Sequence, residues 1–201
     1  YKNQYLYGIY NFPKDSNVNS WGDGGNVGQS SLAQYIATGA SRSAKFTKQP
    51  ELLWWRNQTA GKFYNNVSQF GFDAIFYMDT DDMEDRAPID YPRDHCFIDN
   101  GLTSMHSDLV NTPRTSLYFR SGMYGSFNHT QSDINAFMIE VGGEEIAWKS
   151  GYYDTYGSTH HQNFSKTTPA HNTITVDNGI GQPINQFDAD GRITMFLTNT
   201  D

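Results

Sequence analysis

The sequence has a single cysteine, little positive charge and no long apolar run. Because Cys96 has no second cysteine to pair with, no internal disulfide can form. No stretch of about 18 apolar residues occurs, so we predict no membrane-spanning segment. Lys and Arg number 14 against 22 Asp and Glu, which gives a net charge of −8 and argues against a nucleic-acid-binding protein.

Several catalytic motifs are also missing. The sequence contains no Gly-x-Ser-x-Gly nucleophile elbow, no Gly-x-Gly-x-x-Gly loop and no P-loop. Their absence argues against a serine hydrolase, a dinucleotide-binding enzyme and a P-loop nucleoside triphosphatase, respectively. The acidic segment 79–85 lacks the spacing of a calcium-binding EF-hand loop. We therefore interpret it as a solvated linker.

Glycine and aromatic residues are abundant instead, with 18 Gly, 13 Tyr and 13 Phe. This composition predicts a turn-rich fold, and it is common both in carbohydrate-active proteins, whose rings stack on sugars, and in ordinary β-proteins. The chain begins at Tyr1 and ends at Asp201, next to a predicted strand. We expect it to be a piece of a longer protein.

Residues 1–93 carry helical signals. A helix is predicted over residues 28–40, a second begins at Pro50 and ends near Gly61, and a third covers residues 66–78. Proline at the first position of a helix is favourable because its missing N–H would have no partner there. We place a domain boundary after this region and expect a helical domain over residues 1–93.

Residues 94–201 alternate between apolar and polar with a period of two, which predicts β-strands. The Gly142-Gly143 pair is typical of a hairpin turn between two of them. Helices followed by strands indicate an α+β protein with segregated layers. The predicted strands are 95–98, 102–107, 116–120, 134–141, 145–148, 173–177 and 193–197.

Two histidines stand beside polar residues at the ends of predicted strands. His129 lies among Ser, Asn, Thr and Gln residues, and His171 is followed by Asn172 and an alternating strand. An imidazole in such a place can move protons or bind a ligand. A metal site that adds Asp133 or Asp154 fits no compact zinc spacing. The other histidines are expected to be structural in strands (His95, His106) or solvated in a loop (His160, His161).

Three blocks together carry a resemblance to a known family. Residues 129–137 read His-Thr-Gln-Ser-Asp-Ile-Asn-Ala-Phe, residues 150–153 read Ser-Gly-Tyr-Tyr, and residues 170–173 read Ala-His-Asn-Thr. In this order and spacing they resemble the heparinase II/III-like polysaccharide lyases, which are related to dermatan sulfate epimerases. The resemblance implies the end of an (α/α) toroid over residues 1–93 and an antiparallel β-sandwich-like domain over residues 94–201, truncated at both ends.

By position, the resemblance implies catalytic roles for two residues. His129 matches an active-site histidine of the family, and Tyr153, or Tyr152 if the register shifts by one, matches an active-site tyrosine. The reaction implied is β-elimination on a uronic-acid-containing polysaccharide. A base removes the proton at C5 and an acid protonates the departing O4, and histidine and tyrosine suit these steps. The family's main catalytic tyrosine would lie before Tyr1.

The same comparison of positions bears on metal binding. His171 matches a histidine that binds a structural zinc in some members of the family, but the other two ligand positions carry Gln131 and Lys149 here. An amide and an ammonium are poor zinc ligands. We therefore expect no cofactor and no zinc of that type, and Lys149 could stand in for the charge of the ion.

The remaining candidates are residues that could bind the substrate. Arg120 could pair with the substrate carboxylate through its guanidinium fork. Asn128 and Gln131 could orient the sugar, and tryptophan or tyrosine rings could stack on it. The predicted substrate-binding set is Arg120, Tyr152, Asn128, Gln131, Asp23 (in a loop facing the cleft) and Trp55, with Trp54 and Tyr156 as further stacking rings.

Two alternatives to a lyase stay open. A non-catalytic carbohydrate-binding or structural β-domain is favoured by Gln131 and Lys149, and a uronyl C5-epimerase would begin with the same proton abstraction. The expected partner is an acidic polysaccharide or oligosaccharide, without nucleic acid, and the oligomeric state stays open. The resemblance implies a periplasmic or secreted protein.

Overall fold

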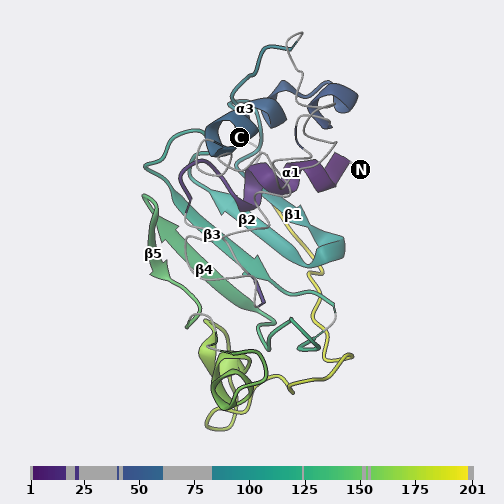
Figure 1. Cartoon of the computed structure of the whole chain (residues 1–201), viewed down its shortest axis with the longest axis vertical. Coiled ribbons are helices and arrows are strands. Elements are labelled where there is room, and N and C mark those ends of the chain that lie inside the picture. Colours follow the sequence, from purple (N-terminus) through teal and green to yellow (C-terminus); the bar gives the residue numbers. More distant parts are fainter. Residues whose placement is uncertain are drawn as a thin grey trace.

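A computed structural model shows a five-stranded antiparallel sheet with helices at one end and short helical turns beyond the other (Figure 1). None of its described helices is long and apolar enough to cross a membrane. The structure describes residues 2–16, 21–22, 40, 43–60, 83–123, 125–150, 153 and 155–198.

The sheet is a meander in which each strand pairs with the next strand along the chain. Gly142 and Gly143 form the last hairpin turn with φ angles of 61° and 87°, values that glycine adopts without strain. The hairpin predicted at this glycine pair is confirmed. The strands are β1 Asp94–Phe97, β2 Leu102–His106, β3 Thr115–Arg120, β4 Ala136–Val141 and β5 Glu144–Ala147.

Helical segments precede the sheet in the chain. Helix α1 covers Lys2–Asn11 and packs on β1 and β2, and helix α3 covers Pro50–Ala60 and packs on α1. The prediction that Pro50 opens a helix is confirmed. The short turns are η2 Ile98–Asn100, η3 His161–Ser165 and η4 Thr168–Ala170. The α+β class with an antiparallel sheet is thus confirmed.

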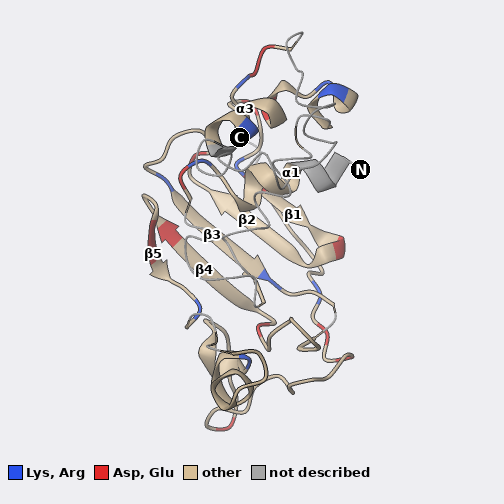
Figure 2. Cartoon of the chain, viewed as in Figure 1, with Lys and Arg blue, Asp and Glu red and all other residues tan. Residues whose placement is uncertain are grey.

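The hydrophobic core joins the helices to the sheet. Ile9 and Tyr10 of α1, Leu52 and Trp55 of α3, and Phe97 of β1 belong to one buried cluster. The described helices and the sheet thus share one core. The division into domains at residue 93 stays a prediction. Figure 2 shows that the charged residues of the described chain lie mostly toward the strand ends and in the loops.

Trp55 forms part of that core and is 1% exposed. Its indole Nε1 donates a hydrogen bond to the carbonyl oxygen of Phe12 at 2.7 Å. A Cβ atom at Gly8 would lie 2.9 Å from the indole ring, so the helix approaches this ring closely. The prediction that Trp55 binds substrate is wrong, because its faces are covered by the protein.

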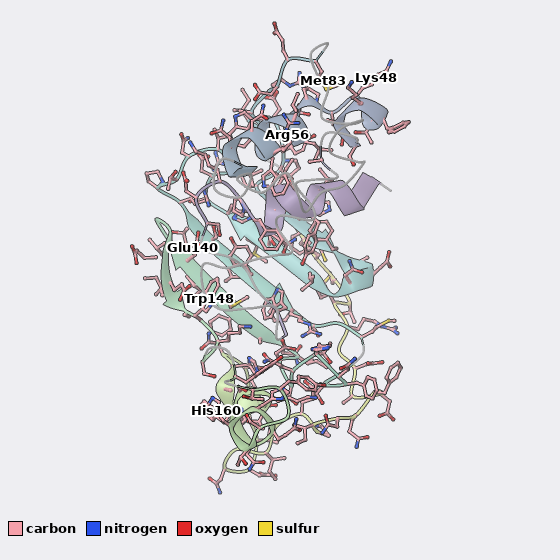
Figure 3. All side chains as sticks on the ribbon, viewed as in Figure 1. Lys48, Arg56, Met83, Glu140, Trp148 and His160 are labelled. Carbon is pink, nitrogen blue, oxygen red and sulfur yellow. The ribbon has the colours of Figure 1, made fainter. Side chains whose placement is uncertain are left out.

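The sheet face beneath α1 is unusually polar. His106 Nε2 lies 2.8 Å from the carbonyl oxygen of Tyr10, so it donates, and its Nδ1 accepts from the Ser116 hydroxyl at 2.9 Å. Ser16 donates to Glu140 at 2.8 Å, and Arg114 approaches Glu140 at 3.7 Å. Figure 3 labels Glu140 on this part of the sheet. These bonds tie the sheet to the N-terminal segment.

Two predicted strands are absent from the sheet. Residues 173–177 and 193–197 are not strands in the structure, and the only bridge there joins Val176 to Ile180. Alternation marks an extended chain, but a strand also needs a neighbour with which to form a hydrogen-bond ladder. The helix predicted over residues 66–78, and that over residues 28–40 except Ala40, lie outside the described residues.

Burial of His106 makes stability depend on pH. Removal from water lowers the pKa of His106 to about 4, whereas an unfolded chain protonates near pH 6.5. Between these values the unfolded state binds more protons, so the free energy of unfolding falls as the pH is lowered from 6.5 toward 4. The loss attributable to this residue amounts to at most about 3 kcal/mol.

Urea titrations of wild type and His106→Gln at pH 7 and pH 5 check this. The variant should lose less free energy of unfolding between the two pH values than wild type does, while the exposed control His160→Gln should behave as wild type. An equal loss in wild type and His106→Gln would show that His106 does not control this dependence.

Candidate active site

His129 lies at the tip of a turn in the long connection between β3 and β4. The Thr130 amide and hydroxyl both donate to the Phe127 carbonyl oxygen, at 3.1 and 2.6 Å, which closes the turn. Asn128 has a φ of 55°, a left-handed conformation that asparagine tolerates better than most residues. Asn128 and His129 are therefore held at the tip, and both are exposed.

Four rings form a contiguous cluster that begins at this turn. The His129 and Tyr156 ring centroids are 5.1 Å apart, those of Tyr156 and His161 are 5.0 Å apart, and those of His161 and Tyr153 are 4.2 Å apart. The Tyr156 hydroxyl donates to Asn128 Oδ1 at 3.1 Å. We call these four residues the His–Tyr cluster. It runs from solvent into the protein interior.

The two tyrosines of the cluster differ in their exposure to solvent. Tyr156 is 49% exposed and Tyr153 only 8%. A ligand resting on His129 would thus meet the Tyr156 hydroxyl, with Tyr153 behind it. The sequence pointed to Tyr153 as the reacting tyrosine and to Tyr156 only as a stacking ring.

His161 closes the cluster from inside and is fully buried. The backbone amide of Gly157 donates to His161 Nδ1 at 2.8 Å, which assigns the ring proton to Nε2. The prediction that His161 is solvated is wrong, because the π-helical turn η3 directs His161 and Ser165 inward. His160 is exposed, as predicted, and Figure 3 shows it in the lobe beyond the sheet.

Lys166 supports the turn from beneath. Its buried ammonium donates to the Asn128 carbonyl oxygen at 2.9 Å and to Asn185 Oδ1 at 2.7 Å. The Lys166 carbonyl oxygen accepts from the Ser132 amide at 2.9 Å. Sequence analysis missed this residue, because nothing around it distinguishes it from a surface lysine.

Lys149 and Gly22 also support the turn. The Lys149 ammonium donates to the Gly22 carbonyl oxygen at 2.7 Å. Gly22 has a φ of 64°, and a Cβ atom there would lie 2.7 Å from the carbonyl oxygen of His129. Only glycine fits this approach without strain. The predicted cleft loop therefore touches His129 through Gly22, whereas Asp23 and Tyr152 lie outside the described residues.

Arg120 is the last residue of β3, and it is buried in an ion pair with Asp133. A guanidinium held in this way is not available to a substrate carboxylate. The structure thus corrects the prediction that Arg120 binds the substrate. The pair instead joins the two ends of the connection that carries His129.

Gln131 also points into the protein. It is 1% exposed, and neither atom of its side-chain amide has a hydrogen-bond partner among the described residues. The prediction that Gln131 orients a sugar is wrong, because its buried side chain cannot reach a ligand at the surface. Of the predicted site residues that the structure describes, Asn128, His129 and Tyr153 are brought together in one place.

The surroundings of His171 do not fit a zinc ion. Burial lowers the pKa of His171; Asp133 acts in the opposite direction, and the positive charges of Lys149 and Arg120 lower this pKa further. The Asp133 carboxylate already pairs with Arg120. The described residues contain no group of three metal-ligating side chains, and an amide such as that of Gln131 is a weak ligand for zinc.

A family profile described as Heparinase II/III-like, C-terminal matches residues 97–199, slightly more than half of the chain. The chain belongs to the heparinase II/III-like family. A comparison with curated proteins gave no match.

Solved heparinase structures share the fold. A heparinase III, the BT4657 gene product with methylated lysines, superposes with a TM-score of 0.60 at 18% identity over 90% of this chain. The heparan sulfate lyase HepC from Pedobacter heparinus gives 0.55 at 17% identity over 89%, and another heparinase III gives 0.58 at 14% identity over 94%. The chain spans 24% to 27% of the length of these structures.

Removal of the Asp133 charge should destabilise the protein. Asp133→Asn leaves the Arg120 guanidinium buried beside a neutral amide, and breaking a buried ion pair in this way costs about 3–5 kcal/mol. Chemical unfolding of the variant measures the loss. The exposed control Glu144→Gln should change stability by less than about 0.5 kcal/mol. A loss no larger than in the control would contradict the structural importance of the pair.

Proposed function

We propose that the chain is part of a polysaccharide lyase that cleaves a uronic-acid-containing polysaccharide by β-elimination. The observation that carries the proposal is the exposed pair of His129 and Tyr156, whose ring centroids lie 5.1 Å apart. Membership of the heparinase II/III-like family supports the lyase class. The protein is further expected to act on an acidic chain in the periplasm or outside the cell.

The chemistry requires one proton acceptor and one proton donor. A base removes the C5 proton, the electron pair of that C–H bond forms the C4–C5 double bond, and the C4–O4 bond breaks with protonation of O4. An imidazole suits the base because its ordinary pKa lies near neutral pH. We assign the C5 proton to His129 and the protonation of O4 to the phenol of Tyr156, which Asn128 orients.

Exposure argues for Tyr156 as the donor. Its hydroxyl is held at the surface, whereas Tyr153 is 8% exposed and lies against the buried His161. A sugar can approach the first tyrosine directly. Tyr153 then acts from behind, through its contacts with Tyr156 and His161.

Local positive charge suits an anionic substrate in spite of the acidic sequence. The ammonium groups of Lys149 and Lys166 hold backbone carbonyls on two sides of the turn. Charges set in the walls of a site act over a few ångströms and are not cancelled by carboxylates elsewhere on the surface. The net charge of −8 is therefore compatible with a polyanionic ligand at this turn.

An ultraviolet assay for the unsaturated uronate tests the proposal on the full-length protein and a panel of uronides. His129→Ala should lower turnover at least about a hundredfold, because a positioned general base contributes about that much. Tyr156→Phe should lower turnover more than Tyr153→Phe does. The matched control His160→Ala changes an exposed histidine outside the His–Tyr cluster and should leave turnover unchanged.

Unchanged turnover in His129→Ala would remove this residue from the reaction. A silent panel with binding retained would instead indicate a binding module or an epimerase. The last two differ in their products, because an epimerase inverts C5 and exchanges its hydrogen with solvent without forming the unsaturated product.

A further inference from the structure

We propose that Lys149 and Lys166 form a built-in cationic clamp that fixes the His129 turn without any metal ion. The inference concerns how the site is shaped. It goes beyond the proposed function and does not depend on whether the protein cleaves a polysaccharide.

The first arm of the clamp is Lys166. Its side chain is 1% exposed, and its ammonium reaches the Asn128 carbonyl oxygen at 2.9 Å and Asn185 Oδ1 at 2.7 Å. Burial of an ammonium is costly unless its protons are bonded, so these acceptors are held firmly. Because the Lys166 carbonyl oxygen also accepts from the Ser132 amide, this one residue holds the chain on both sides of His129.

The second arm is Lys149, two residues after the end of β5. Its ammonium donates a hydrogen bond to the Gly22 carbonyl oxygen at 2.7 Å and so fixes the position of Gly22. The space is tight, since a Cβ atom on Gly22 would come within 2.7 Å of the His129 carbonyl oxygen. Lys149 thus acts on His129 through Gly22 and is a positioning residue.

The side chains at these positions do not fit a divalent cation. The Asp133 carboxylate is already paired with Arg120, and the described residues contain no group of three metal-ligating side chains. A metal ion would find the Gln131 amide and the Lys149 ammonium where an anionic or imidazole ligand is needed. The clamp supplies positive charge through covalently attached ammonium groups instead.

Two measurements on the full-length protein test the clamp. The first is metal analysis together with thermal unfolding before and after treatment with EDTA. We expect no stoichiometric metal and an unchanged Tm. One bound metal per protein, with a fall in Tm after chelation, would overturn the proposal.

The second measurement is hydrogen exchange of two amides: that of Thr130, which donates to the Phe127 carbonyl oxygen, and that of Ser132, which donates to the Lys166 carbonyl oxygen. Lys149→Met and Asn185→Ala should each lower protection of these amides about tenfold or more, because the turn opens more often when a support is lost. Asn185 is exposed, so its variant weakens the hold on Lys166 without burying a new group.

The control is Lys48→Met, an exposed lysine that Figure 3 places at the opposite end of the molecule from His160. It should leave the exchange of both amides unchanged. Wild-type protection in folded Lys149→Met and Asn185→Ala would overturn the clamp. Lyase turnover is not a readout of either measurement, so a failure of the clamp and a failure of the proposed function can be told apart.

Discussion

The buried ion pair between Arg120 and Asp133 joins the two ends of the connection that carries His129. Arg120 is the last residue of β3, and Asp133 lies three residues before β4 begins at Ala136. The backbone register of the sheet, in which Arg120 lies opposite Ala136, therefore fixes where the connection leaves and re-enters. The pair therefore limits where the residues of the connection, including the His129 turn, can lie.

The site end of the molecule is held by side chains that bond to the backbone. Asn172 shows this, since its amide nitrogen donates to the carbonyl oxygens of both Phe137 and Trp148 and ties the segment before residue 173 to β4 and β5. Such bonds fix the path of the backbone, but they lack the cooperativity of the hydrogen bonds in a helix or a sheet. A region built in this way can open locally while the shared core of α1 and β1 stays folded.

The strands β1 to β5 could be predicted because each pairs with its neighbour in the sequence, so local alternation and turn residues carry the information. The same alternation failed at residues 173–177, where no strand among the described residues completes a ladder. Burial of His161 and Lys166 could not be predicted either. Lys166 bonds to Asn128 and Asn185, which are far from it in the sequence, so no local pattern encodes these contacts. His161 is directed inward by a π-helical turn, a conformation that neither the helical nor the strand period signals.

Lys149 places a fixed positive charge beside the segment that supports the His129 turn. An ammonium group attracts an anionic ligand in a constant direction only when its own position is fixed, because a long lysine side chain otherwise samples many rotamers. The bond from Lys149 to Gly22 meets that condition, and Gly22 in turn lies against His129.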